Sequence, residues 1–265
     1  MTNFRKKNLK RSSLKILYFN NESFNKEIVN TDNKNFFDSA SNYYQTLYKN
    51  NTLSTIPGLG NCFAVKLAKI LIELIDNNKF KLTQNNRFRK NFYDISLKEV
   101  INSSLSKDIS DPEVLLIYIK QIIHILRSTD IIGNEEGVAL INNCFNSSDD
   151  LFYILFHGFW EKVKWDEIFP SDKEAANDLK KNKSMLVDII IRQYKKIQID
   201  TLANNFFELT GFSDKNDLFM ISFLDFYFFT WLKHFGILNY INIKNNPSIY
   251  LKINEKGRKF LSTLI

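Results

Sequence analysis

Hydrophobic residues recur with helical spacing along most of the chain after about residue 50. The clearest case is residues 62–76, where Lys66, Lys69 and Glu73 fall within one narrow polar stripe and the opposite face is apolar. The same periodicity predicts helices from Arg87 onward and at 114–126, 151–163, 184–194, 217–234 and 255–264. The pattern therefore indicates a mainly α protein.

Local signals mark the ends of several of these helices. Asp111-Pro112-Glu113 combines an N-cap side chain, a proline at the first helical position and an acid in the first turn, and 114–126 is apolar almost all round. Asn254 caps the closing helix. Residues 79–83 alternate like a short strand, and the alternating runs 241–244 and 249–253 follow Gly236 around a turn at 245–248. We therefore expect a mainly α fold with small β-hairpins.

The end of the chain resembles a known fold. The stretch from His234 to Leu238, the hairpin, and then Ile253 to Leu261 resemble the second half of a winged-helix domain, with Asn254 in place of the usual threonine cap. Fainter likenesses occur at 125–132, as a helix end before a degenerate wing, and at 79–90, as a wing strand that leads into a helix.

Over residues ~50 to 265 the order of elements is similar to uncharacterised bacterial helical proteins of the SEC-C-motif-associated or plasmid accessory type. The resemblance implies a fold and no activity. The zinc motif of that group needs clustered cysteines, whereas Cys62 and Cys144 lie far apart in the sequence. The predicted organisation is a basic, weakly ordered segment at 1–49, a helical winged-helix-like unit at 50–145, an aromatic helical connector at 146–199, and a C-terminal winged-helix-like unit at 200–265.

Composition and charge narrow the class of protein. The 265 residues are 44% hydrophobic, which is typical of a globular chain, and only 8 Gly and 4 Pro argue against a many-stranded β fold. The net charge of +7 is concentrated in residues 1–17, 79–98 and 244–260, each with an excess of Lys and Arg over acids. These patches would suit phosphate backbones, and solvated helix faces are the alternative.

A glycine-containing turn adds a second nucleic-acid signal. Ile56-Pro57-Gly58-Leu59-Gly60 before a helix matches the turn of a helix-hairpin-helix, whose backbone N–H groups hold a DNA phosphate. An ordinary Pro-Gly turn remains the alternative. The nucleic-acid-binding residues that this hypothesis predicts are Gly58, Gly60, Lys66, Lys69, Lys81, Arg87, Arg89 and Lys90.

No motif indicates catalysis, a metal or a cofactor. His124, His157 and His234 each lie in apolar or helix-end contexts that favour structural roles, and the acidic pair Asp149-Asp150 is explained by helix capping. The basic N-terminal run lacks the apolar stretch of a signal peptide, and 218–232 is too short and contains an aspartate. We therefore expect a cytoplasmic, non-enzymatic protein without a membrane span.

Aromatic residues crowd one C-terminal helix: Phe219, Phe223, Phe226, Tyr227, Phe228, Phe229 and Trp231. They predict either packing on the 151–165 and 184–194 helices or an apolar patch for dimerisation. The polar positions of that helix carry no net charge, so it is suited to protein packing and not to reading bases. The leading hypothesis is a non-catalytic adaptor or regulator, associated with mobile elements, that binds a protein partner or a second copy through this aromatic half. Nucleic-acid binding is the alternative.

Overall fold

The computed structural model describes residues 56–107, 109–142, 145–170, 172–193, 196–211, 221–242 and 248–264. It is mainly helical with small antiparallel sheets, which confirms the predicted fold class. The N-terminal segment 1–49, Asp217, Phe219 and most of the 245–248 turn lie outside the described residues. Across the part that is described, no helix combines the length and the apolar character needed to cross a membrane.

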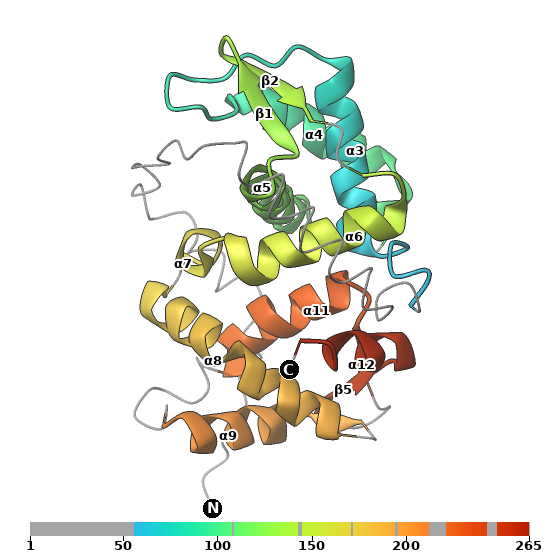
Figure 1. Ribbon diagram of the computed structural model, residues 1–265, viewed down its shortest axis with the longest axis vertical. Coiled ribbons are helices and arrows are strands. Elements are labelled where there is room, and N and C mark those ends of the chain that lie inside the picture. Colours follow the sequence, from blue (N-terminus) through green and yellow to red (C-terminus); the bar gives the residue numbers. More distant parts are fainter. Residues whose placement is uncertain are drawn as a thin grey trace, which may run out of the picture.

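The first set of elements, here called the first module, runs from α3 to β2 (Figure 1). It comprises α3 (Phe63–Asn77), α4 (Lys90–Asn102), the short η1 (Ser104–Lys107), α5 (Pro112–Ser128), β1 (Ile132–Glu135) and β2 (Val138–Ile141). The predicted strand at 79–83 is reduced to bridges, in which Lys81 pairs with Val138 and Leu82 with Phe88. The predicted start of α5 is confirmed, because the Asp111 side chain accepts a hydrogen bond from the Glu113 amide.

Helices then connect this module to the rest of the chain. They are α6 (Ser148–His157), the π-helical η2 (Gly158–Lys162) and α7 (Trp165–Ile168). Two lysines of the following helix donate to the carbonyl groups at the end of η2, since Lys180 bonds to Glu161 and Val163, and Lys183 bonds to Trp160. These bonds satisfy carbonyl groups that a helix end leaves without partners.

The second module runs from α8 to β5 and is followed by α12. It comprises α8 (Lys173–Arg192), β3 (Ile197–Gln198), α9 (Ile199–Thr210), the π-helical η3 (Leu224–Phe229), α11 (Thr230–His234), β4 (Leu238–Asn242), β5 (Ile249–Ile253) and α12 (Glu255–Leu261). The strand β3 belongs to the expected connector at 146–199, yet it pairs with β5 of the C-terminal hairpin. The first strand of that hairpin lies at 238–242 and not at 241–244, because buried Leu238 pairs with Ile253.

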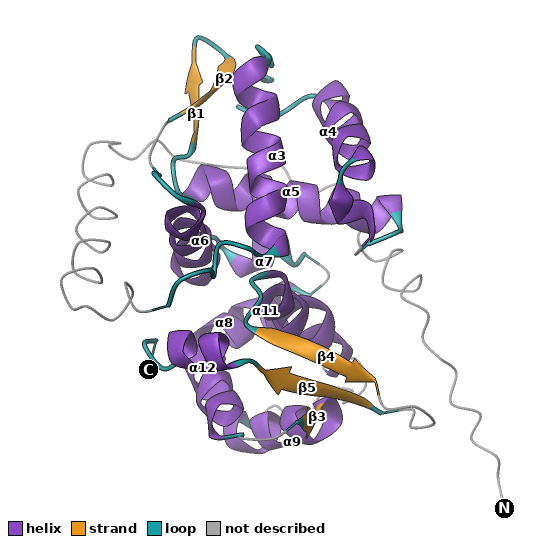
Figure 2. Cartoon of the chain, turned by 90° about the vertical axis from the view of Figure 1, so that its right-hand side faces the viewer, coloured by secondary structure: helices purple, strands orange, loops and turns teal. Residues whose placement is uncertain are grey.

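Both modules have the same order of elements, although the sequence contains no exact repeat and shows only faint likenesses at 79–90 and 125–132. Each consists of a helix, a short extended segment, two further helices and a hairpin, and Figure 2 shows the two hairpins, β1–β2 and β4–β5. In each module the short segment pairs with the second hairpin strand. In the first module Lys81 bridges β2, and in the second β3 joins β5 in the strand order β3-β5-β4.

The hydrogen bonds around the two hairpins are also the same. The Ile131 amide donates to the Leu126 carbonyl, and the Ile237 amide donates to the Leu232 carbonyl in the same way. The residue before each of these amides has a positive φ angle, which is 54° for Asp130 and 67° for Gly236. An asparagine closes each hairpin: the amide and side chain of Asn142 bond to Ile131 and Asp130, and those of Asn254 bond to Ile237 and Gly236. The modules therefore share their detailed local geometry.

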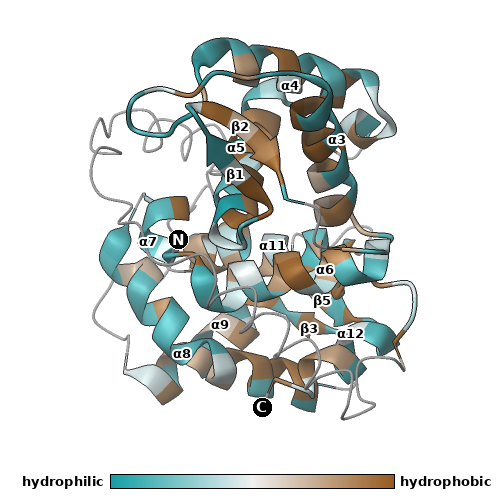
Figure 3. Cartoon of the chain, turned by 45° about the horizontal axis from the view of Figure 1, so that its top comes forward, coloured by the Kyte–Doolittle hydropathy of each residue, from teal (hydrophilic) through white to brown (hydrophobic). Residues whose placement is uncertain are grey.

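A single core joins all of these elements. Aromatic rings of the C-terminal helix pack against the connecting helices, with ring-centroid distances of 5.4 Å for Phe159–Trp231, 6.1 Å for Trp160–Phe228 and 4.4 Å for Phe169–Tyr227. Packing within the chain, one of the two predicted outcomes for this helix, is confirmed. Figure 3 colours the ribbon by hydropathy: much of α8 is hydrophilic, β2 is largely hydrophobic, and α3 alternates between the two.

Candidate nucleic-acid interface

The predicted nucleic-acid-binding residues fall into two separate groups. Gly58, Gly60, Lys66 and Lys69 lie before and within the first turns of α3, whereas Lys81, Arg87, Arg89 and Lys90 follow its far end. Because α3 has 15 residues, its length of about 22 Å separates the groups. Figure 2 shows α3 running from the side of α6 to the β1–β2 hairpin. One surface therefore does not hold all eight.

The glycine turn binds a carboxylate of the same chain. The amides of Gly58 and Gly60 donate to the two oxygens of Asp149, at 3.0 and 2.6 Å, and Lys69 donates to the Ser148 hydroxyl at 2.7 Å. A Cβ on Gly60 would lie 2.3 Å from the Ser148 backbone, so this close approach requires glycine. The two amides expected to hold a DNA phosphate thus fasten the turn to α6. Phosphate binding by this turn stays a prediction, and it requires Asp149 to leave.

The second group includes a compact hairpin that positions Arg87. The Thr83 amide donates to the Arg87 carbonyl at 2.8 Å, and the Arg87 amide donates to the Thr83 hydroxyl at 3.1 Å. Between them Asn86 has a φ angle of 61°, and its side-chain oxygen accepts a hydrogen bond from Asn134 of β1 at 2.5 Å. Arg87 is therefore held by a turn tied to the β1–β2 hairpin. Arg89 and Lys90 are exposed where α4 begins.

Residues 114–126 were predicted to form a helix that is apolar almost all round, but the helix observed there, α5, carries a polar stripe. Lys120, His124 and Arg127 are spaced by four and three residues, so they share one face of the helix. Tyr118 lies on the opposite face, where its ring packs on Trp231 with a centroid distance of 6.2 Å. The spacing of these three residues was the signal that could have revealed the stripe.

The stripe and the Arg87 hairpin meet between α4 and α5. The Arg127 guanidinium lies 5.0 Å from the Phe88 ring centroid, and the Lys120 ammonium lies 5.9 Å from that of Tyr93. We call Arg87, Lys120 and Arg127, with His124 and Tyr93, the cationic cluster. Within the described ranges, no carboxylate forms an ion pair with Arg127 or Lys120.

The pKa shifts in this cluster reflect burial near positive charge. The pKa of His124 is lowered to about 4, chiefly by burial and in addition by the charges of Arg127 and Arg87. Burial also lowers the pKa of Arg127, and the charge of Arg87 acts in the same sense. At neutral pH His124 is therefore uncharged, and the two arginines and Lys120 supply the positive charge.

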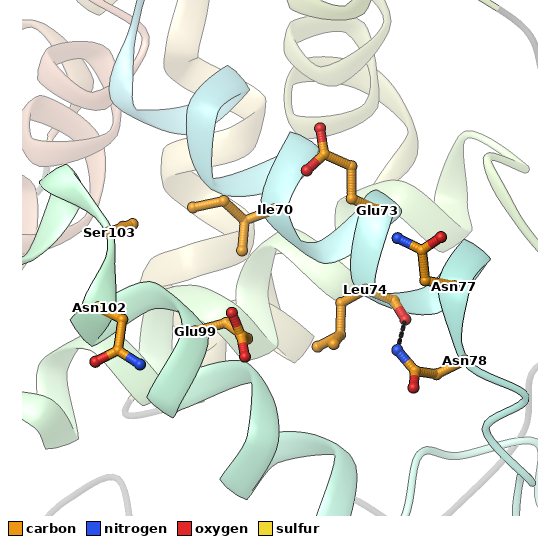
Figure 4. Close-up of a pocket in the computed structure, with 8 residues that line it drawn as sticks. All are labelled: Ile70, Glu73, Leu74, Asn77, Asn78, Glu99, Asn102 and Ser103. Carbon is orange, nitrogen blue, oxygen red and sulfur yellow. Dashed lines mark hydrogen bonds between the residues drawn. The ribbon is translucent and has the colours of Figure 1, made fainter.

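A pocket of about 350 Å³ lies between α3 and α4 (Figure 4). Its lining is acidic and amide-rich: Ile70, Glu73, Leu74, Asn77, Asn78, Glu99, Asn102 and Ser103. The Asn78 side chain donates to the Leu74 carbonyl at 2.8 Å. Carboxylates at Glu73 and Glu99 repel phosphate, so this pocket lies outside the candidate interface. Among the residues that the structure describes, no three His, Cys, Asp or Glu side chains are grouped as metal ligands.

The comparisons with known proteins identify no relative of this chain. No protein family model matches the chain, and neither a curated protein nor a solved structure matches it. The likeness to bacterial proteins of the SEC-C-motif-associated or plasmid accessory type accordingly stays a prediction, and the functional argument depends on the geometry alone.

Proposed function

We propose that this protein is a non-catalytic nucleic-acid-binding protein made of two winged-helix modules, and that the first module contacts duplex DNA. The observation that carries the proposal is the pair of α5 cations, Arg127 over the Phe88 ring and Lys120 over the Tyr93 ring, with which no carboxylate among the described residues forms an ion pair. Such a cluster gains electrostatic free energy when a phosphate backbone approaches.

The order of elements supports a winged helix in each module. In helix-turn-helix proteins the second helix of the motif enters the major groove, and its outward side chains contact bases and phosphates. The corresponding helix of the first module is α5, and its stripe of Lys120, His124 and Arg127 faces away from the core contact of Tyr118. Arg89 and Lys90 at the start of α4 would add phosphate contacts on the same side.

The tip of the β1–β2 hairpin has the opposite charge. Glu135 and Glu136 are exposed there, next to Gly137. Their carboxylates would repel phosphates, so the proposal places DNA on the α4–α5 side and not on this hairpin.

The second module fits a supporting role. Its equivalent helix, residues 221–234, buries Tyr227, Phe228 and Trp231, and the Tyr240 hydroxyl donates to the Asp225 carboxylate at 2.5 Å. These residues stabilise the core and leave no cationic stripe. The adaptor hypothesis stays a prediction, and these three rings, which it offered to a partner or a second copy, are buried within the chain.

The test is a fluorescence anisotropy titration of the full chain with a generic duplex of about 20 base pairs. We expect binding at about 50 mM salt that weakens steeply towards 200 mM. Changing Arg87 and Arg127 to Gln should abolish most of this affinity. A charge-matched control, Lys173→Gln with Lys181→Gln on exposed positions of α8, should retain it. No binding by the wild type at low salt would contradict the proposal.

A further inference from the structure

We propose that the cleft between α3 and α4 binds an arginine side chain of a protein partner. The cleft lies outside the proposed DNA contact, because two of the side chains that line it, Glu73 and Glu99, repel phosphate. The first module would therefore carry a second interaction surface, which does not depend on DNA binding. An equivalent cleft in the second module already holds an arginine of this chain.

The second cleft has a volume of about 320 Å³ and lies between α8 and α9. These are the first two helices of the second module, as α3 and α4 are of the first. At the end of α3 the Asn78 amide donates to the Ile75 carbonyl at 3.3 Å. At the end of α8 the Gln193 amide donates to the Ile190 carbonyl in the same way, at 3.2 Å. Asn78 and Gln193 therefore occupy corresponding positions.

When residues are counted back from these two caps, the linings of the clefts match in position. The first helix and its cap contribute Glu73, Leu74, Asn77 and Asn78 in one cleft and Asp188, Ile189, Arg192 and Gln193 in the other. The second helix contributes residues with the same spacing, which are Glu99, Asn102 and Ser103 in one cleft and Asn205, Glu208 and Leu209 in the other. The two clefts are therefore the same feature of a repeated module.

The second cleft holds a guanidinium group on its carboxylate. The Arg192 Nε donates to one oxygen of Asp188 at 3.0 Å, and Nη2 of the same arginine lies 2.7 Å from the other oxygen. Two parallel bonds of this kind fix the orientation of the guanidinium as well as its position. A carboxylate at this position of the module therefore accepts a guanidinium.

The α3–α4 cleft has the carboxylate without the arginine. Glu73 takes the place of Asp188, whereas Asn77 takes the place of Arg192. The residues that line this cleft include no cation. An arginine from outside the chain can therefore occupy the place that Arg192 fills in the second module.

The two carboxylates of the α3–α4 cleft are available to a partner. Lys69 lies one turn before Glu73, but its ammonium donates to the Ser148 hydroxyl at 2.7 Å. Within the stretches that the structure describes, neither Glu73 nor Glu99 forms an ion pair. Both residues are exposed, so an isolated cation would gain little over water, whereas a polypeptide adds contacts around the cleft. The occupant is therefore an arginine of a protein and not a small cation.

The remaining lining fits the stem of an arginine. Ile70 and Leu74 are partly buried against the core, and Figure 4 shows them between the carboxylates of Glu73 and Glu99. The methylene groups of an arginine would cover this apolar surface while its guanidinium reaches the carboxylates. The amide oxygen of Asn102 is a further acceptor in the same cleft for the N–H groups of the guanidinium.

The experiment is a chemical-shift titration of the isotope-labelled full chain with two peptides. One is a short peptide with a single arginine between apolar residues, and the other has neutral citrulline in place of the arginine. We expect the arginine peptide to shift amide signals at the ends of α3 and α4, and the citrulline peptide to leave them in place. Arg192→Asn should open the second cleft, so that the arginine peptide then also shifts signals at the ends of α8 and α9.

Two further variants test the carboxylates of the α3–α4 cleft. Asn77→Arg copies the second module, so the new guanidinium should cover Glu73 and remove peptide binding. Glu73→Gln with Glu99→Gln should weaken binding about fivefold or more, since each exposed ion pair contributes little on its own. A charge-matched control, Glu135→Gln with Glu136→Gln at the exposed tip of the β1–β2 hairpin, should retain the wild-type affinity.

The outcomes separate the site from its occupant. Equal shifts by the two peptides, or equal weakening in the Glu73→Gln, Glu99→Gln protein and the control, would overturn the site. Peptide binding that survives Asn77→Arg, or unchanged α8 and α9 signals in Arg192→Asn, would refute the equivalence of the two clefts. If the peptide binds only after Arg5 and Arg11 are changed to Gln, the occupant is the N-terminal segment of this chain and the partner is wrong. The DNA titration tests the proposed function separately from all of these results.

Discussion

Replacing Asp149 by Ala should separate the glycine turn from α6 and destabilise the fold. The carboxylate accepts hydrogen bonds from Gly60 at 2.6 Å and Gly58 at 3.0 Å. Hydrogen bonds to a charged group are worth about 1.5–3 kcal/mol each. The Gly58 bond is exposed, so water replaces it at little cost, but the Gly60 bond is partly buried. We therefore expect a loss of about 3 kcal/mol, and roughly half of that for Asp149→Asn, which keeps one acceptor oxygen.

The assay is urea unfolding followed by the fluorescence of the buried tryptophans Trp160, Trp165 and Trp231. Asp150→Ala is the control, since both acids lie in the first turn of α6 near its positive dipole end, and Asp150 accepts a local, exposed hydrogen bond from the Asn146 amide. The reasoning is refuted if Asp149→Ala is no more destabilising than Asp150→Ala. The same variant tests the alternative anion site, because a rise in DNA affinity on loss of Asp149 would place phosphate in the glycine turn.

Three further predictions concern the core and its protonation. Burial lowers the pKa of His124 to about 4, below the 6.5 of an unperturbed histidine, so the unfolded state takes up the proton first as pH falls. The free energy of unfolding should drop by about 2 kcal/mol between pH 7.5 and 5, and His124→Gln should remove that decrease. If urea unfolding gives the wild type and His124→Gln the same pH dependence, His124 is not its source. Phe229→Ala should lower the free energy of unfolding by about 3–5 kcal/mol, and Phe226→Ala by clearly less because Phe226 is only half-buried. Equal losses in the two variants would contradict the observed packing of Phe229. Gly257→Ala should cost about 1–3 kcal/mol because a Cβ would lie 2.2 Å from the Ile237 carbonyl oxygen, and an unchanged unfolding midpoint would contradict that contact.

Local signals in the sequence were sufficient for much of the fold. The caps predicted at Asp111 and Asn254 are present, because each side chain accepts a hydrogen bond from a backbone amide of the first turn. These features depend on neighbouring residues, which a sequence displays directly. Contacts between distant residues were not visible. Asp149 was interpreted as a helix cap, yet Ser147 caps α6 and Asp149 reaches a turn 89 residues away at Gly60.

Two similar units were expected from faint likenesses in the sequence, but the residues that correspond between them could not be identified there. Asp130 and Gly236 occupy equivalent left-handed positions, and Asn142 and Asn254 make equivalent bonds. Most other equivalent residues differ in type. Backbone geometry, and not side-chain identity, is what the two modules share, so a search for repeated letters fails. The cationic cluster likewise needed the tertiary structure, because the residues of the Arg87 turn and those of α5 meet only when α4 and α5 pack together.

The most direct test of the account is site-specific photo-crosslinking to duplex DNA. A photoreactive amino acid would replace Lys120 of α5 in one protein and Lys233 of α11 in another; both positions are exposed, and they lie on the equivalent helices of the two modules. We expect a protein–DNA adduct from position 120 and none from position 233. An adduct from position 233 alone, or none from position 120 when DNA is bound, would contradict it.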